Sequence, residues 1–181
     1  MIKKTFVQAQ ELLDDSFRLG HQIMRDGFHP DYIVGIWRGG SPIAIAIHEM
    51  LSFHGFPSDH IAVRTSSYYG IEKQRDQVEV YGLQYIIEHV GADNSLLIVD
   101  DVFESGRSMQ GLIGKISHLL RDKTPKTIRI ATVYHKPTKR KVSREPDYFV
   151  HQTDNWLVFP HELQGLTEEE VAAYKPLALV T

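Results

Sequence analysis

The sequence contains no cysteine among its 181 residues, which excludes disulfide bonds, thiolate metal ligands and a cysteine nucleophile. It also has no apolar run long enough for a membrane span or a signal peptide. We therefore expect a cytoplasmic protein that does not bind membranes. The formal net charge is only −3, so the chain as a whole does not attract nucleic acid, and any bound anion has to be held by local groups.

Three site patterns are also missing. The chain contains neither the P-loop string G-x-x-x-x-G-K-[ST] nor the dinucleotide string G-x-G-x-x-G. No two of its ten histidines stand four residues apart, as they would on a metal-binding helix. We interpret the histidines as mainly surface or structural residues.

The residues that are present predict one globular domain over residues 1–181, because 42% of them are hydrophobic. Apolar spacing predicts an amphipathic helix over 8–26, and Ser41 with Pro42 predicts the N-cap and first turn of a helix over 41–55. Residues 107–122 also have a helical pattern. Short apolar runs predict strands at 31–37, 60–67, 95–100 and 126–135. This alternation predicts an α/β fold with a parallel sheet.

The stretch "SLLIVDDVFESGRSMQGLI", residues 95–113, carries the clearest chemistry. Asp100 and Asp101 end a predicted strand, where two carboxylates suit a cis-diol, a divalent cation or both. The turn from Glu104 to Ser108 offers backbone N–H groups and two hydroxyls at a helix N-terminus, which suits a phosphate. Together they indicate a sugar phosphate. The alternative is that these residues only cap the strand and the helix.

Leu96 to Ser108 resembles the signature for 5-phosphoribosyl-1-pyrophosphate (PRPP) in type I phosphoribosyltransferases. The resemblance implies their fold, a twisted parallel sheet flanked by helices with a small C-terminal hood. It implies that Asp100 and Asp101 bind the ribose hydroxyls, and that Glu104 accepts a proton during catalysis. The 5-phosphate would lie against Ser105, Gly106, Arg107 and Ser108. Magnesium is the implied cofactor, with Asp100, Asp101 and Glu162 as its ligands.

Two other segments resemble parts of the same family. "IWRGGSP" resembles its pyrophosphate loop, in which Arg38 adds charge and assists catalysis while Gly39 and Gly40 allow close approach of an anion. We expect a cis peptide between Trp37 and Arg38, as in the 6-oxopurine branch. Residues 64–80 resemble the mobile catalytic lid, with Ser67 and Tyr68 at its Ser-Tyr pair. A plain surface loop is the alternative.

The base pocket of the 6-oxopurine branch is also recognisable. Lys136, before Pro137, matches the lysine that reaches the purine O6, while Trp156 and Leu157 match the stacking residue and its neighbour. His161 replaces a tryptophan of the xanthine-guanine branch, and Glu162 replaces an aspartate. The resemblance divides the chain into a core over about 30–145, a hood over about 146–163 together with the N-terminal segment, and a C-terminal helix over 167–175. The capping-box residues Thr167 and Glu170 open that helix.

The function implied is transfer of a phosphoribosyl group from PRPP to a 6-oxopurine (hypoxanthine, guanine or xanthine). The products would be a nucleoside monophosphate and pyrophosphate, and the enzyme would be a dimer or tetramer. Two alternatives stay open. One is a phosphoribosyltransferase for another base. The other is a PRPP-sensing regulator that uses the basic segment 136–144 to bind nucleic acid or another protein.

Overall fold

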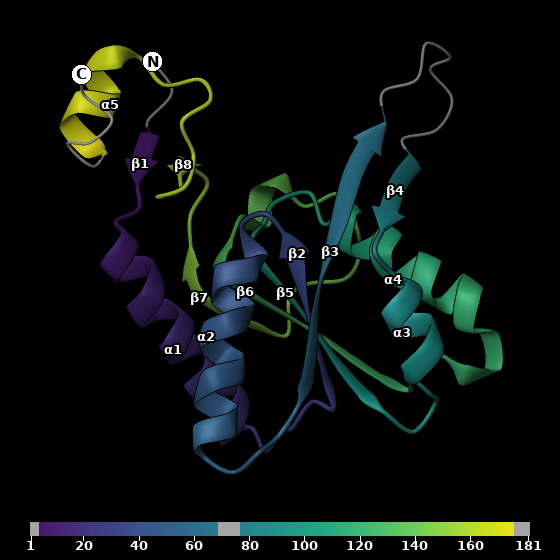
Figure 1. The fold of residues 1–181 in the computed structure, drawn as a ribbon. Helices are drawn as coiled ribbons and strands as arrows, with labels where there is room; N and C mark the ends of the chain where they lie inside the picture. Colours follow the sequence, from purple (N-terminus) through teal and green to yellow (C-terminus); the bar gives the residue numbers. More distant parts are fainter. Residues whose placement is uncertain (1–3, 69–76, 176–181) are drawn as a thin grey trace.

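The computed structural model describes residues 4–68 and 77–175. Its centre is a six-stranded sheet in the order β4-β3-β2-β5-β6-β7 (Figure 1). All neighbouring strands are parallel except β3 and β4. The predicted α/β class is confirmed, and the antiparallel strand β4 is an addition to it. The strands are β2 (Tyr32–Trp37), β3 (Asp59–Tyr68), β4 (Gln77–Tyr81), β5 (Ser95–Phe103), β6 (Thr127–His135) and β7 (Tyr148–Gln152).

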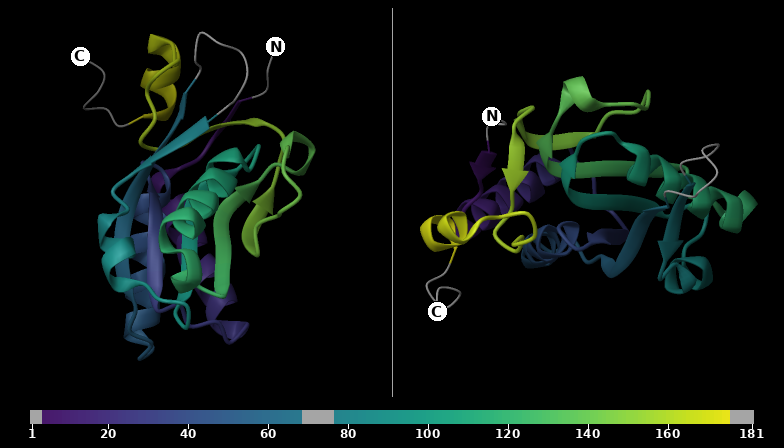
Figure 2. Two further views of the ribbon diagram at one scale, coloured as in Figure 1. Left: turned by 90° about the vertical axis from the view of Figure 1, so that its right-hand side faces the viewer. Right: turned by 90° about the horizontal axis from the view of Figure 1, so that it is seen from above.

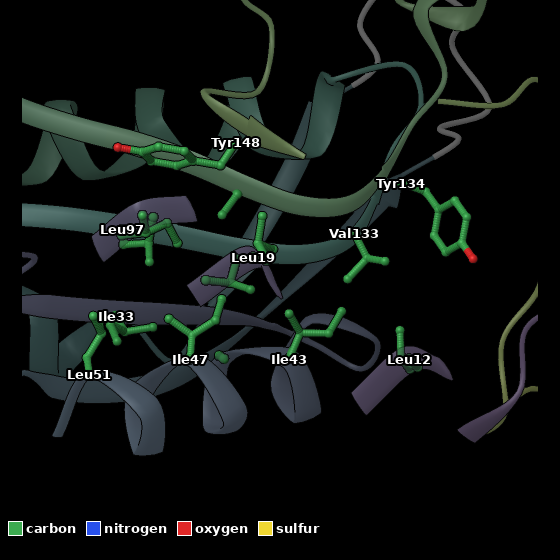
Figure 3. Packing of buried hydrophobic residues seen from close by; sticks show 14 of the residues in the cluster. Leu12, Leu19, Ile33, Ile43, Ile47, Leu51, Leu97, Val133, Tyr134 and Tyr148 are labelled. Atoms are coloured by element: carbon green, nitrogen blue, oxygen red, sulfur yellow. The ribbon is translucent and has the colours of Figure 1, made fainter. Parts of the chain in front are cut away.

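Helices cover both faces of this sheet. The helices α1 (Ala9–Arg25) and α2 (Gly40–Phe53) pack on one face, and α3 (Gln84–His89) and α4 (Arg107–Leu120) lie on the other. On β5, Leu97 and Val99 enter the first hydrophobic cluster, and Leu96 and Ile98 enter the second. Figure 3 shows the first cluster, in which side chains of α1 and α2 meet those of the strands. Burial on both faces explains the unbroken apolar run of β5.

Helix α2 begins at Gly40, so the predicted N-cap at Ser41 is wrong. The backbone of Gly39 is already helical, with φ −67° and ψ −31°, and the N–H of Ser41 donates to the carbonyl of Arg38 at 3.2 Å. The helical turn therefore starts inside the glycine loop. Helix α4 begins at Arg107, as predicted, and ends at Leu120, two residues before the predicted end.

The described residues of the segment expected to be an aperiodic lid, 64–68 and 77–80, are strand. β3 and β4 pair from Arg64 opposite Tyr81 to Tyr68 opposite Gln77, so they form an antiparallel arm. Ser67 and Tyr68 end β3, but their side chains and residues 69–76 lie outside the described residues. The short helices α3, Arg121–Lys123 and Pro137–Lys139 were not predicted. Elements of three to six residues leave too little sequence to establish a period.

The hood consists of residues 4–7 and 153–166. It contains a second, two-stranded sheet, in which β1 (Lys4–Phe6) runs parallel to β8 (Trp156–Val158). Helix α5 (Glu168–Tyr174) packs beside it, and the capping box of Thr167 and Glu170 is confirmed. Figures 1 and 2 show β1, β8 and α5 together at one end of the molecule.

The range predicted for the hood, from about residue 146, includes strand β7. β7 is the edge strand of the main sheet, where it pairs with β6, and Tyr148 lies in the first hydrophobic cluster. The apolar residues of β7 lie on a buried face of the strand. The sequence alone could not decide whether this strand belongs to the main sheet or to the sheet of the hood. Among the described residues, no helix has the length and apolar character needed to cross a membrane.

Candidate active site

The two aspartates of the signature lie inside strand β5. The strand continues to Phe103, three residues beyond the predicted end at Asp100, because β6 pairs with β5 along this length. The N–H of Asp101 donates to Oδ1 of Asp100 at 3.0 Å. Both aspartates are partly buried, and the side chain of Asp101 is 13% exposed. Strand β5, which is central in the sheet, thus places two adjacent carboxylates near its carboxyl end, where the loop to α4 begins.

A pocket of about 220 Å³ adjoins the first aspartate; we call it the phosphate pocket. It includes Asp100, the turn residues Glu104 to Ser108 except Arg107, and three apolar residues. Gly106 has φ +76° and directly precedes α4, and the N–H of Arg107 donates to Oγ of Ser105 at 3.3 Å. The turn therefore opens at a helix N-terminus, where a phosphate is favourably placed. The lining residues are Asp100, Val102, Phe103, Glu104, Ser105, Gly106, Ser108 and Met109.

The glycine loop packs directly on β5. A Cβ atom at Gly39 would lie 1.7 Å from Oδ2 of Asp101, and one at Gly40 would lie 2.3 Å from the carbonyl oxygen of Val99. Any side chain at either position would displace the aspartate pair or its strand. Glycine is thus required at both positions because the loop packs closely on β5. The sequence did not reveal this requirement, which adds to the predicted close approach of an anion. The Trp37–Arg38 peptide is cis, as predicted, and Arg38 is exposed.

Burial and neighbouring acids destabilise the charged forms of both aspartates. Burial raises the pKa of Asp100 well above its ordinary value, and the charge of Asp101 raises it further. Burial, followed by the charge of Glu162, raises the pKa of Asp101 to about 6. Nε2 of His161 is 3.9 Å from Oδ2 of Asp101, but burial lowers the pKa of this imidazole. A cation bound beside these acids would relieve their repulsion.

This acidic environment fits a divalent cation such as magnesium. The described residues contain one cluster of three metal-ligating groups within 4.8 Å, which is Glu11, Asp15 and His151 and not the predicted set. Oε2 of Glu162 instead accepts from the N–H of Phe159 at 2.9 Å. Magnesium commonly takes only one or two carboxylates and completes its shell with water and substrate phosphates. Asp100, Asp101 and Glu162 can serve in that way without forming a closed cage.

A lysine and a glutamate face each other beside the phosphate pocket. Lys136 follows β6, and its N–H donates to the carbonyl of Phe103 at 2.9 Å. Its Nζ donates to Oε2 of Glu104 at 3.2 Å. The lysine side chain is 7% exposed and the glutamate 51%. The parallel pairing of β5 with β6 therefore brings together the two residues predicted for purine O6 and for proton transfer.

The other predicted base contacts lie in the hood. Trp156 is 57% exposed, whereas Leu157 is buried. Both line a pocket of about 270 Å³ with Glu162, and Lys4 of the paired strand β1 also lines it. Lys136 is not among its lining residues. In this structure the predicted base-binding residues thus form two groups, one beside the phosphate pocket and one in the hood.

Sequence reasoning missed two sets of supporting residues. The N–H of Lys141 donates to the carbonyl of Ser105 at 3.0 Å, and Val142 fills the space beside Gly106, so this segment supports the phosphate turn from behind. The ammonium of Lys175 donates to the carbonyl of Phe159 at 2.7 Å. The basic run around residue 141 was a visible signal, but it was considered only as the segment with which a regulator would bind nucleic acid or another protein. No local pattern marked Lys175.

Comparison with known proteins agrees with this geometry. Residues 4–164 match the model of the phosphoribosyl transferase domain, and the chain belongs to this family. A hypoxanthine-guanine phosphoribosyltransferase of Streptococcus pneumoniae is 26% identical over 164 residues, which cover 90% of this chain and 85% of the relative. One of Streptococcus mutans is 24% identical over 156 residues, which cover 85% and 81%.

Solved structures share the fold. A purine phosphoribosyltransferase from Pyrococcus horikoshii has a TM-score of 0.72 and 25% identity, covering 91% of this chain and 97% of that one. A hypothetical protein from Neisseria gonorrhoeae with bound ppGpp has a TM-score of 0.71 at 17% identity, covering 96% of each chain. The predicted family and fold class are therefore confirmed.

Proposed function

We propose that this protein transfers the phosphoribosyl group of PRPP to N9 of a 6-oxopurine and so serves purine salvage. The products are a nucleoside 5′-monophosphate and pyrophosphate. The observation that supports this most is that the phosphate pocket adjoins the lysine predicted for the base. Asp100 and Glu104 line the pocket, and Glu104 accepts a hydrogen bond from Lys136 at 3.2 Å. A sugar phosphate and a carbonyl-bearing base can meet there.

The reaction exchanges one bond at C1 of the ribose for another. The bond from C1 to pyrophosphate breaks, the oxygen leaves with the electron pair, and the bond from C1 to N9 forms. Asp100 and Asp101 accept hydrogen bonds from the ribose hydroxyls, and the turn from Ser105 to Ser108 binds the 5-phosphate. Positioning and charge stabilisation then supply most of the rate.

Charge at the leaving group is balanced from the glycine loop and by the metal. Arg38 is exposed beside Gly39 and Gly40, and its guanidinium would contribute positive charge to the pyrophosphate. When bound, magnesium supplies charge neutralisation for that group, and Asp100, Asp101 and Glu162 are the residues that would hold it. Glu104 accepts the proton that the purine loses, as an exposed carboxylate with room to move.

Lys136 determines the class of base. An ammonium group has donors and no acceptor, so it can pair with the O6 of an oxopurine but not with the amino group of adenine. A buried donor facing another donor costs about 1 to 3 kcal/mol or more. The exposed ring of Trp156 offers a stacking surface for the base, and the backbone beside Leu157 would offer hydrogen bonds to it.

One experiment tests the proposal directly. The protein is incubated with PRPP, magnesium and hypoxanthine, guanine, xanthine, adenine or orotate, and nucleotide formation is followed by chromatography. We expect turnover of hypoxanthine and rejection of adenine and orotate. The Lys136→Ala variant should lose activity by roughly 10-fold or more on each oxopurine and discriminate less against adenine. Robust use of adenine or orotate by the wild type would contradict the proposal.

The regulator alternative predicts tight PRPP binding without turnover of any base. The contacts of the basic segment 136–144 argue against it. Lys136 is buried against Glu104, Arg140 bonds two carbonyls and Glu145, and Arg144 bonds the carbonyl of Ile128. These contacts tie three of the five basic side chains to the domain, although Lys139, Lys141 and Arg144 are exposed. The dimeric or tetrameric state and the cytoplasmic location stay predictions.

A further inference from the structure

The residue Lys175 is a buried cation outside the part of the chain that matches the family model. That match ends at residue 164, and α5 begins at Glu168. Lys175 follows the last residue of α5 and is only 9% exposed. A buried ammonium is costly unless its donors are satisfied. The partners of this one therefore indicate what it does.

Its partners are backbone carbonyls of the hood. Nζ of Lys175 donates to the carbonyl of Phe159 at 2.7 Å and approaches that of Pro160 at 3.4 Å. The same carbonyl of Phe159 accepts the N–H of Glu162 at 3.0 Å, and Oε2 of Glu162 accepts the N–H of Phe159 at 2.9 Å. Lys175 thus completes the hydrogen bonding of a closed turn. This turn directly follows β8, the strand that carries Trp156 and Leu157.

Two other contacts hold α5 against the same region. Nζ of Lys4 forms an ion pair with Glu170 at 2.7 Å. The ring of Tyr174 stacks on that of Phe6, with centroids 3.8 Å apart and planes 10° apart. Both partners belong to β1, which pairs with β8 in the order Lys4 opposite Trp156. Figures 1 and 2 show α5 beside β1 and β8 at the same end of the molecule.

We propose that α5 is a clamp for the base-binding hood and that Lys175 is its principal positioning residue. Through the turn 159–162, Lys175 holds β8 and Glu162 in the arrangement that presents Trp156 to the base. The ammonium contacts no substrate itself. This inference rests on the proposed function as far as the base is concerned, whereas the ordering of the hood by Lys175 does not depend on it.

The test measures hydrogen exchange of backbone amides in the free protein. Lys175→Met keeps an unbranched side chain that is one heavy atom shorter and removes the three donors. A charge-assisted hydrogen bond contributes enough that exchange of peptides covering 156–163 should accelerate by about 10-fold or more. Peptides covering β5 should be unchanged. The matched control is Lys126→Met, which removes an exposed lysine paired with Asp93 at 3.0 Å and should change neither region.

Two further variants keep the test decisive. Lys175→Arg retains a buried donor and should restore slow exchange at least in part. Tyr174→Ala removes the stacked ring, leaves Lys175 in place, and should accelerate exchange in the same peptides by a smaller factor, and this half-exposed position tolerates truncation. If neither Lys175→Met nor Tyr174→Ala changes exchange over 156–163, the clamp is wrong.

Kinetics then separates this inference from the proposed function. In an active wild type, Lys175→Met should raise the KM for hypoxanthine by roughly 10-fold and change kcat much less, because it loosens binding and not the chemistry. Faster exchange with an unchanged KM would overturn the role in base binding. If the wild type turns over no base at all, the proposed function fails, and the exchange result alone decides on the clamp.

Discussion

The phosphate pocket and the hood are built in different ways. The pocket takes its polar groups from residues 100–108. These residues belong to the end of β5, to the turn and to the start of α4, and the apolar residues of β5 are buried on both faces of the sheet. The hood has two strands of three residues each, and its contacts to α5 include an ion pair between residues 166 positions apart in the chain. The pocket thus has a continuous framework, while the hood depends on a few long-range contacts.

Under the proposed function, this difference fits the part of the substrates that each region would recognise. A phosphate and a ribose diol are the same in every reaction of this kind, so a fixed set of amides and carboxylates suffices. A planar base has to enter, stack and leave, which is easier at an exposed ring such as Trp156 than in the interior. The hood is therefore the region where we expect motion and variation in substrate.

Replacement of both Asp100 and Asp101 by Asn should have the largest effect, and this effect should be confined to the phosphate pocket. Binding of magnesium and PRPP should weaken by roughly 100-fold or more, because two charge-assisted contacts to the ribose are lost. Titration calorimetry measures the loss. The hood should keep its hydrogen exchange, since neither residue contributes to its hydrogen bonds. Unchanged PRPP affinity in the folded variant would remove the assignment of the phosphate pocket.

Glu104→Gln should affect turnover and leave binding in both regions intact. The amide keeps the shape of the side chain but cannot accept a proton, so kcat should fall by about 100-fold on the usual scale of general-base catalysis. Steady-state and single-turnover rates with hypoxanthine measure this change. PRPP affinity and base KM should stay within a small factor. Normal turnover would mean that another group takes the proton.

Asp101→Asn should show the smallest effect, on the stability of the free protein. The folded-state pKa is raised from 3.8 to about 6, so the folded state binds a proton more tightly than the unfolded chain. This group therefore makes the wild type less stable as pH rises from about 4 to about 6, with no further loss above that. At pH 7 the variant should be more stable by about 1 to 3 kcal/mol.

Urea unfolding of the wild type and Asp101→Asn at several pH values measures this difference. The gain should become small near pH 4 and disappear below about pH 3, where Asp101 is protonated in both states. Carboxylates whose pKa values are lowered, such as that of Asp26, affect both proteins equally and cancel in the comparison. Equal stability at pH 7 would show that burial and the charge of Glu162 do not destabilise the carboxylate of Asp101.

The sequence predicts the pocket far better than the hood, for a physical reason. Strand β5, the turn at Gly106 and helix α4 are encoded locally, by an apolar run, small residues and a helical period. The pairing of β1 with β8 and the bond from Lys175 to Phe159 depend on residues that meet only after folding. Strands of three residues carry no period of their own. The Thr167 capping box was predictable because it is local.

The pairing of β1 with β8 also bears on the order in which the chain assembles. Among the described elements, β1 is synthesised first and α5 last, and strands β2, β5 and β6 with helices α1, α2 and α4 are complete before β8 exists. Until β8 is synthesised, residues 4–6 lack the strand that they pair with in the fold, and segments with unpaired backbone groups can associate with other chains. The framework of the phosphate pocket can thus form early, whereas the contacts between the hood and α5 can form only after α5 has been synthesised.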